Sequence, residues 1–210
     1  MSAPLELSLK IPQPEEGENS KELNLMINCK PYLAMDPYVD RIRINQSKKV
    51  WEINQILNLK ERMKEMKNFI NMGKDICIIQ GFFCEYGFNI TLGDEIFIGA
   101  NCTFLDVAPI KVGSRTMIGP NVQILTPNHP IIPEERIGPK AREWGESIII
   151  GEDCWIGAGV TICPGITIGN GSSIGAASVI TKNVPPRSVV VGNPGRVIKR
   201  IKEDGTVERV

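Results

Sequence analysis

Histidine is nearly absent from this chain: among 210 residues, His129 alone carries an imidazole. An excess of charge of one sign is also missing, because 24 Lys and Arg balance 24 Asp and Glu. Without a net field, the chain has no general attraction to nucleic acid or to an anionic membrane surface. No apolar run approaches the length of a membrane-spanning helix. We therefore expect a globular protein without nucleic-acid or membrane partners.

The six cysteines are widely spaced and form no CxxC pair, and the N-terminus lacks the basic start and apolar core of a secretory signal. We expect reduced cysteines, a cytoplasmic location and no metal quartet. The length fits one domain with a small appendage, and a hydrophobic content of 42% is enough for a packed core.

Aliphatic residues recur every six positions, and glycine often follows them. This period fits neither a helix nor a long strand, but it fits a short strand followed by a tight bend. Three such units would make one triangular coil, with the aliphatic side chains inside. Stacked coils would pair their strands in parallel, which predicts a β-helix. The series are Leu92, Ile98 and Phe104; Val112, Ile118 and Ile124; and Ile150, Ile156, Ile162, Ile168, Ile174 and Ile180.

The repeat is interrupted twice. Two extra residues enter between Phe104 and Val112, and after Ile124 the series stops for the loop 126–147, which contains His129. Long loops in compact repeats are usually functional or disordered. The histidine, the tryptophan and the charges of this loop favour a functional role.

The ends of the chain leave the repeat. Residues 1–20 are rich in Pro, Glu, Gly and Ser, which predicts a flexible tail. Asp36 before Pro37 is typical of a helix start, and Asn58 with Glu61 resembles a capping box. These patterns predict a helical cap over 21–73, a coil domain over 74–195 and a basic C-terminal tail over 196–210.

Several stretches carry a family resemblance: "YGFNITLGD", "FLDVAPIKVG", "IGPNVQILT", "HPIIPEER", "CWIGAGVTICPGITIG", "IGAASVITKNVPP" and "VVGNPGRVIK". From about residue 28 to 201, the chain resembles the hexapeptide-repeat acyltransferases, and among them the maltose and galactoside O-acetyltransferases. The resemblance implies a mainly β fold, a left-handed parallel β-helix with a helical N-terminal cap and one extended loop. It also implies a homotrimer with active sites between subunits.

His129 is the candidate catalytic residue. Transfer of an acetyl group to an alcohol requires removal of the hydroxyl proton, and imidazole suits that task near neutral pH. By resemblance, His129 is the general base, and the Ala158 backbone N–H stabilises the oxyanion. The alternative is a histidine that is merely a surface residue or a satisfied core residue.

The resemblance implies acetyl-CoA as the acetyl donor, bound between coils of two subunits without a metal. Arg and Lys side chains are the usual partners of its phosphates. Each residue also has a simpler interpretation: Trp155 as core, Lys182 as a solvated charge and Arg196 as a clasp to its own coil. The implied donor-site residues are Trp155, Ala158, Ala176, Thr181, Lys182, Arg196 and Lys199.

The resemblance implies that the acceptor is a small molecule with a hydroxyl group and that acidic residues help to bind it. Carboxylates suit polyols because they accept several hydrogen bonds. Asp36 could instead be only a helix cap, and Asp106 only a turn residue. Gly99 replaces an asparagine of the family, and we expect it to leave a hole in the pocket. The implied acceptor-site residues are Asp36, Gly99, Asn101, Asp106, Glu143 and Trp144.

Three other functions share the coil or the chemistry of this family. A carbonic anhydrase built on this coil needs three histidines around zinc, and one histidine excludes it. An N-acetyltransferase acting on an amino sugar or an antibiotic-like amine would use the same base and donor. A non-catalytic scaffold would explain the coil but not the histidine loop. The sequence therefore favours an acyltransferase that uses acetyl-CoA to acetylate a hydroxyl of a sugar or other small molecule.

Overall fold

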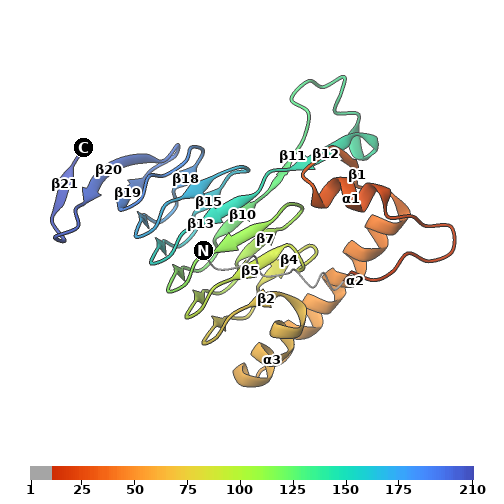
Figure 1. Ribbon diagram of the computed structural model, residues 1–210, viewed down its shortest axis with the longest axis horizontal. Coiled ribbons are helices and arrows are strands. Elements are labelled where there is room, and N and C mark those ends of the chain that lie inside the picture. Colours follow the sequence, from red (N-terminus) through yellow and green to blue (C-terminus); the bar gives the residue numbers. More distant parts are fainter. Residues whose placement is uncertain (1–10) are drawn as a thin grey trace.

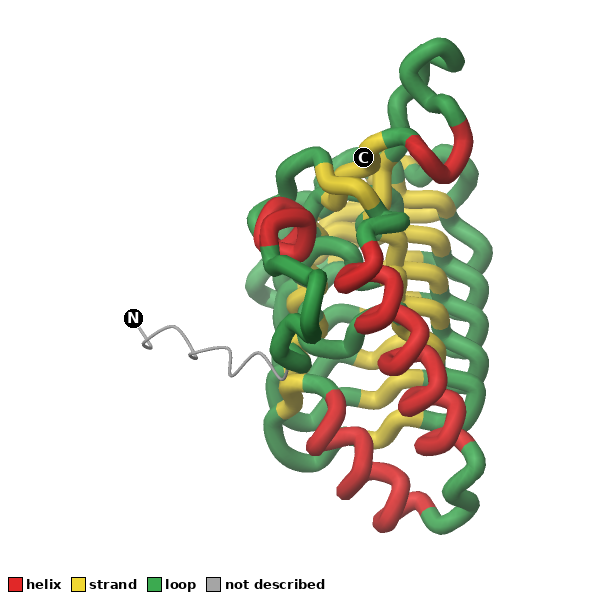
Figure 2. The backbone as a smooth tube through the Cα atoms, turned by 90° about the vertical axis from the view of Figure 1, so that its right-hand side faces the viewer, coloured by secondary structure: helices red, strands yellow, loops and turns green. Residues whose placement is uncertain are grey.

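The six-residue repeats form short strands that end in sharp bends, as the sequence predicts. In the computed structural model, which describes residues 11–210, these strands stack in parallel into three faces of a prism (Figure 1, Figure 2). From β2 to β10 and again from β13 to β18, successive strands belong to face 1, face 2 and face 3 in turn. The predicted parallel β-helix is confirmed.

Each face is one sheet. Face 1 contains β2 (Asn71–Met72), β5 (Ile90–Leu92), β8 (Ile110–Val112), β13 (Ile148–Ile150) and β16 (Thr167–Ile168). Face 2 contains β3 (Cys77–Ile78), β6 (Phe97–Ile98), β9 (Met117–Ile118), β14 (Trp155–Ile156), β17 (Ser173–Ile174), β19 (Ser188–Val191), β20 (Arg196–Ile201) and β21 (Val207–Arg209). Face 3 contains β4 (Phe83–Cys84), β7 (Thr103–Leu105), β10 (Gln123–Leu125), β15 (Thr161–Ile162) and β18 (Val179–Ile180).

The repeated aliphatic residues point into the prism and form one continuous core. On face 2, Ile156 is in register with Ile118 on one side and Ile174 on the other. These side chains are fully buried, and so is Phe104. Its ring packs edge-on against Phe82, with 5.1 Å between the ring centroids. Burial of a large apolar side chain contributes roughly 1.5–3 kcal/mol relative to exposure. The stacked core is therefore the main source of stability of the coil.

The faces meet at three edges, which we name by a feature of each. The loop edge, between faces 3 and 1, includes residues 85–89, 106–109, 126–147, 163–166 and 181–183. The Ala158 edge, between faces 2 and 3, includes residues 99–102, 119–122, 157–160 and 175–178. The Arg115 edge, between faces 1 and 2, includes residues 93–96, 113–116, 151–154 and 169–172.

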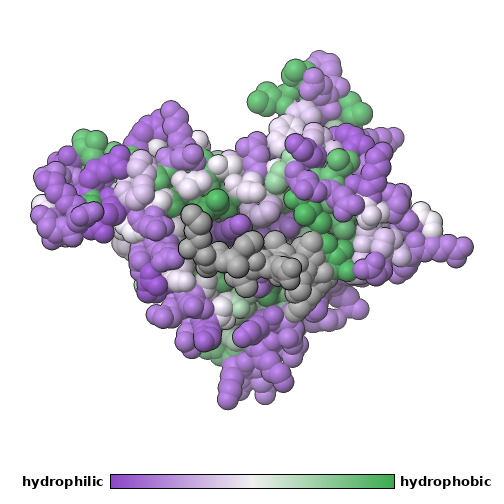
Figure 3. Space-filling model, in the orientation of Figure 1, coloured by the Kyte–Doolittle hydropathy of each residue, from purple (hydrophilic) through white to green (hydrophobic). Residues whose placement is uncertain are grey.

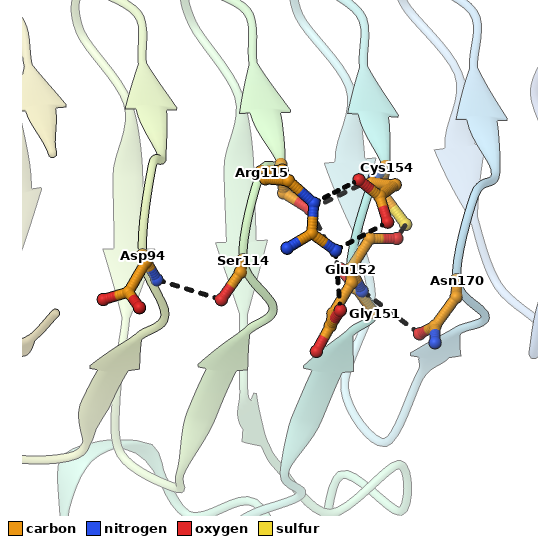
Figure 4. A network of polar contacts seen from close by, with 9 residues as sticks. Asp94, Ser114, Arg115, Gly151, Glu152, Cys154 and Asn170 are labelled. Carbon is orange, nitrogen blue, oxygen red and sulfur yellow. Dashed lines mark hydrogen bonds and ion pairs between the residues drawn. The ribbon is translucent and has the colours of Figure 1, made fainter. Parts of the chain in front are cut away.

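Side chains link successive coils along the Arg115 edge (Figure 4). Arg115 donates to Asp153 at 2.7 Å and to Glu152 at 2.8 Å in the next coil. The backbone N–H of Glu152 in turn donates to the Asn170 side chain at 3.1 Å. These ion pairs are exposed, so each contributes little by itself. Their common effect is to fix how one coil sits on the next.

The glycines after the aliphatic residues allow the coils to approach closely. A Cβ placed on Gly113 would lie 2.5 Å from both the Glu152 nitrogen and the Gly151 carbonyl carbon. Positive φ angles occur two residues later, for example at Arg115 with φ 59°. Glycine at position 113 is therefore explained by crowding against the neighbouring coil and not by a positive φ angle.

Three helices cover the first coil and part of the loop edge (Figure 2): α1 (Lys21–Ile27), α2 (Pro37–Asn54) and α3 (Leu59–Phe69). Asp36 caps α2 by accepting the N–H groups of Tyr38 and Val39, and the Asn58 side chain caps α3. Both helix starts agree with the sequence. Met66 and Phe69 of α3 join the core of the coil, so α3 closes one end of the prism. The coil begins with β2 at Asn71, slightly before the predicted boundary at residue 74.

The ends of the chain differ from the predicted tails. Residues 1–10 of the predicted flexible tail lie outside the described residues, whereas residues 11–20 lie against the helices. There, Glu18 accepts hydrogen bonds from Arg41, and Ile11 packs on the cluster around α1. The expected tail over 196–210 is instead an antiparallel extension of face 2, formed by β20 and β21. None of the helices in residues 11–210 combines the length and apolar composition needed to cross a membrane.

The interrupted repeat becomes a projecting arm with its own small sheet (Figure 1). The loop 126–147 leaves along β11 (Pro127–Asn128), contains the short 3-10 helix η1 (Gly138–Lys140) and returns along β12 (Arg142–Gly145). The strand β1 (Tyr32–Leu33), which follows α1, pairs with the other side of β12. The base of the loop is therefore held between the coil and the helical cap.

Replacing Gly113 with alanine tests the crowding at the coil bends. We expect Gly113→Ala to lower the free energy of unfolding by about 2–3 kcal/mol, because the new Cβ would displace backbone atoms. Gly171→Ala is the matched control: φ is +66° there, but the nearest atom is 3.5 Å away, so the cost is about 1 kcal/mol. Denaturant titrations followed by circular dichroism measure both values. Equal losses in the two variants would contradict the crowding explanation.

Candidate active site

His129 follows directly after β11, at the base of the projecting loop. In the antiparallel register, Asn128 lies opposite Trp144, so the next residue, His129, lies level with Glu143. His129 Nδ1 is 3.5 Å from Glu143 Oε2, and the imidazole is 55% exposed. For Nε2, no hydrogen-bond partner is found among the described residues. The histidine thus has one nitrogen toward a carboxylate and the other free for a ligand.

A cavity of about 390 Å³ adjoins this pair. Its walls come from the stretch before α2 and from the middle and end of the loop. Apart from His129, Glu143 and the guanidinium group of Arg136, the wall residues are apolar or glycine, so the space beside the imidazole can hold an apolar group as well as a hydroxyl. The wall residues besides His129 and Glu143 are Ala34, Met35, Arg136, Gly138, Pro139 and Ala141.

A second cavity of about 200 Å³ lies on the other side of Glu143. It shares Ala34 and Met35 with the first cavity and adds Arg43, Glu85 and Tyr86. One carboxylate oxygen of Glu85, Oε2, is buried without a hydrogen-bond partner in the structure. Burial, together with the nearby Asp106 and Glu143, raises the pKa of Glu85 to about 7. A polar ligand group could satisfy this carboxyl group.

The sequence analysis missed most of the residues that line these cavities. Glu85 could have been found, because it stands at the loop edge one coil before Asp106, where the stacking of coils brings the two together. Arg43 lies on a helix and Met35 in a turn without periodicity, so no motif in the sequence marked either residue as part of the site.

Asp106 and Asp36 do not line either cavity. Asp106 is fully buried and accepts the backbone N–H groups of Glu85, Tyr86 and Gly87 at 3.0, 2.9 and 2.7 Å. Burial raises its pKa to about 6, although these donors act in the opposite direction. Both carboxylates thus make the structural contacts of the simpler interpretation, since Asp106 holds a turn and Asp36 caps α2, and their contact with an acceptor stays a prediction.

Trp144 supports the base of the loop. Its indole N–H donates to Glu146 Oε1 at 3.2 Å, and the Asn128 side chain donates to the same oxygen at 2.8 Å. Since it lines neither of the two cavities, its contact with a substrate stays a prediction. Its observed role is to tie β11 to β12.

The predicted donor-site residues Ala158 and Ala176 lie on the Ala158 edge, and both are exposed. The Ala158 carbonyl accepts the N–H of Ala177, while its own N–H has no acceptor among the described residues. Trp155 lies on the outer surface of face 2 and is 58% exposed, so it is not a core residue. These groups are available to a ligand.

The other four predicted donor-site residues lie near the last coil: Thr181, Lys182, Arg196 and Lys199. Lys182 and Arg196 line one cavity of about 170 Å³. Arg196 also donates to the Gly195 carbonyl at 2.8 Å, which is the clasp weighed from the sequence. Thr181 is exposed beside Lys182, and Lys199 lies in β20 opposite Val189. The cationic side chains of Lys182 and Arg196 therefore lie together, and Thr181 and Lys199 are close to them in the sequence.

The candidate residues fall on two different edges of the prism. His129 and Glu143 belong to the loop edge, whereas Asn101, Ala158 and Ala176 belong to the Ala158 edge, on the other side of face 3. A single chain therefore does not bring the imidazole to the Ala158 N–H. Contact between them requires the loop edge of one copy to meet the Ala158 edge of another.

The expectation that Gly99 leaves a hole is wrong. A Cβ at this position would lie 2.5 Å from the Pro120 nitrogen and 2.7 Å from the Gly119 carbonyl carbon. Gly99 sits against the next coil, and this crowding accounts for the missing side chain.

Comparison with known proteins identifies the family. Residues 147–182 match the model of the bacterial transferase hexapeptide (six repeats), and residues 89–125 match that of the hexapeptide repeat of succinyl-transferase. The sophorolipid acetyltransferase of Starmerella bombicola is 38% identical over 191 residues, covering 85% of this chain and 73% of the relative. The chain belongs to the hexapeptide-repeat acetyltransferases.

Solved structures of this family superpose on nearly the whole acetyltransferase. A maltose O-acetyltransferase from Clostridium difficile 630 has 40% identity and a TM-score of 0.83, covering 87% of this chain and 98% of that one. A hexapeptide-repeat acetyltransferase from Vibrio cholerae O1 biovar eltor, complexed with acetyl coenzyme A, has 32% identity and a TM-score of 0.80. It covers 87% of this chain and 99% of its own.

Asp106→Asn separates a structural role of Asp106 in this acetyltransferase from an acceptor-binding role. The amide would place a donor against at least one backbone N–H, so we expect a loss of roughly 2 kcal/mol in unfolding free energy. The control is Asp94→Asn, because Asp94 accepts one exposed N–H through Oδ1 and should change stability by less than about 0.5 kcal/mol. Unchanged stability with weakened acceptor binding would instead favour a substrate role for Asp106.

Proposed function

We propose that this protein transfers the acetyl group of acetyl-CoA to a hydroxyl group of a sugar or other small molecule, with His129 as general base. The observation that carries this proposal is the pairing of His129 with Glu143 at the wall of a cavity. Glu143 faces Nδ1, which leaves Nε2 to accept a proton from a hydroxyl in the cavity.

The reaction balances without a covalent acyl-enzyme. His129 Nε2 removes the hydroxyl proton while the acceptor oxygen attacks the thioester carbonyl carbon. The resulting oxyanion accepts a hydrogen bond from the Ala158 N–H, an exposed donor without a partner among the described residues. Collapse of the intermediate breaks the carbon–sulfur bond, and the imidazolium returns its proton to the CoA thiolate. The products are an acetyl ester and free CoA.

We place the site between two subunits of a homotrimer, with the loop edge of one against the Ala158 edge of the next. The separation of His129 from Ala158 within one chain supports this arrangement. An exposed apolar row on face 2, formed by Phe97, Met117 and Trp155 in register, offers a surface for a neighbouring subunit or for the pantetheine arm. Lys182 and Arg196 would meet the phosphates of the donor.

Besides a simple sugar, a second candidate acceptor is a molecule that carries both a hydroxyl group and a hydrophobic part. The apolar residues in the cavity wall beside His129 favour it. Figure 3 shows hydrophobic residues at the tip of the projecting loop, where Ile131 is 90% exposed and Ile137 is 61% exposed. The relative from Starmerella bombicola is named for a glycolipid substrate. A glycolipid could place its hydroxyl at the imidazole and its chain along this wall.

His129→Ala tests the general base. We expect the rate of acetyl transfer to fall by about 10²–10⁴-fold, because the proton acceptor is lost. Thiol release from acetyl-CoA measures the rate across simple sugars, methyl and octyl glycosides of one sugar, and amines. Calorimetry with CoA serves as the control, because the variant should bind CoA as the wild type does.

The panel also decides the acceptor class. A higher kcat/KM for the octyl than for the methyl glycoside would favour the glycolipid, and turnover of amines alone would replace O-acetylation by N-acetylation. Full activity of His129→Ala with any acceptor would contradict the mechanism.

Mixing two inactive variants tests the shared site. Ala158→Pro deletes the proposed oxyanion donor, and the equivalent position of the preceding coil is already proline, Pro120, in the same kind of bend. Loss of one oxyanion donor typically lowers kcat by about 10²–10³-fold. After co-refolding of Ala158→Pro with His129→Ala, about a quarter of the sites would combine two intact edges in a cyclic trimer.

Activity near a quarter of the wild-type value is therefore the expected result. A mixture as inactive as its two components would show that both residues act within one chain.

A further inference from the structure

The pairing of three strands sets up a row of three side chains. In the register of β11 with β12, His129 is level with Glu143, and in the register of β12 with β1, Glu143 lies directly opposite Tyr32. Side chains that are directly opposite in neighbouring strands lie on the same face of a sheet and contact each other. The row therefore runs from the exposed imidazole, through a carboxylate, to a residue of the helical cap.

Tyr32 holds the carboxylate oxygen that His129 does not use. Its hydroxyl donates to Glu143 Oε1, whereas His129 Nδ1 faces Oε2 at 3.5 Å. Tyr32 is fully buried, in a cluster with Tyr86 and Val107. Burial raises the pKa of Tyr32, so its hydroxyl remains a donor across the working pH range. Glu143 thus has a hydrogen-bond donor on Oε1 and the imidazole beside Oε2.

We propose that Tyr32 is a positioning residue of the reaction, which acts through Glu143 to hold the His129 imidazole in its productive orientation. This inference rests on the proposed function and extends it into the N-terminal cap. A carboxylate fixed through one oxygen keeps the other aimed at Nδ1, so Nε2 stays directed toward the cavity. Without Tyr32 the carboxylate can rotate, and productive alignment becomes one of several orientations.

Among the described residues, Tyr32 gives Glu143 Oε1 its only hydrogen bond, and the neighbouring Glu85 is itself a carboxyl group. Loss of the Tyr32 hydroxyl therefore leaves this oxygen without a partner. The titratable and charged groups that face Glu143 or line the cavities beside it are Tyr32 from β1, His129 after β11, Arg136 from the loop, Arg43 from α2, and Glu85 and Tyr86 from the loop edge.

Tyr32→Phe tests the proposal, because it removes the hydroxyl and keeps the ring. We expect kcat to fall about ten-fold, which corresponds to about 1.4 kcal/mol in the activation barrier. The KM for acetyl-CoA should stay unchanged. Tyr38→Phe is the matched control: Tyr38 is buried in the same cluster, but its hydroxyl donates to the Pro12 carbonyl. It should leave kcat as it is.

The outcomes separate this proposal from the proposed function. If His129→Ala is inactive but Tyr32→Phe matches the wild type in kcat, the role of Tyr32 is wrong and the general base stands. If the wild type turns over no acceptor, the proposed function itself fails. Equal effects of Tyr32→Phe and Tyr38→Phe would reduce the role of Tyr32 to packing.

A double-mutant cycle provides the second measurement. Because Tyr32 acts through Glu143, Tyr32→Phe should cost almost nothing further in a Glu143→Gln background. Independent, additive losses would overturn the proposal. Melting temperatures of the four proteins show which variants are folded. Where Tyr32→Phe is not folded, Tyr86→Phe takes its place, since Tyr86 belongs to the same buried cluster as Tyr32.

Discussion

Backbone hydrogen bonding between successive coils is the constraint on which the rest of this molecule depends. Each strand pairs in register with the strands one coil before and one coil after, as Ile156 does with Ile118 and Ile174. Such stacking demands nearly identical coils, and the core tolerates little variation in volume. Insertions can therefore occur only where the chain bends outward. This is why the long loop, and with it His129, leaves the fold at an edge rather than from a face.

The helical cap has two roles that its position explains. The helix α3 closes the open end of the prism with Met66 and Phe69, which would otherwise leave core residues in water. The strand β1 lies at the opposite end of the cap and completes the small sheet at the base of the loop. Arg142 strengthens this joint by donating to the Glu22 carboxylate from α1. The cap thus supports both the stability of the coil and the geometry of the site.

The sequence predicts the periodic parts of the fold well and the site only partly. The hexad residues and the caps Asp36 and Asn58 follow local rules, because each depends on neighbours a few positions away. The pairing of Tyr32 with Glu143 joins residues 111 positions apart and depends on a register that no local pattern encodes. Glu85 lies next to Asp106 only through the stacking of coils, so it is found by aligning the coils and not by any local pattern. Gly99 was misjudged because residue types do not show a backbone contact.

The pairing of β1 with β12 also affects the order in which parts of the protein fold. Contacts between distant residues form late in folding, since the cost of closing the intervening chain must be met first. Here the intervening chain includes three coils of the prism, from β2 to β10. On a ribosome, the partner of Tyr32 emerges long after Tyr32 itself. A nascent chain can therefore have a finished α3 and several finished coils while β1 still lacks its partner strand, so the small sheet beside His129 forms only after residue 145 has been synthesised.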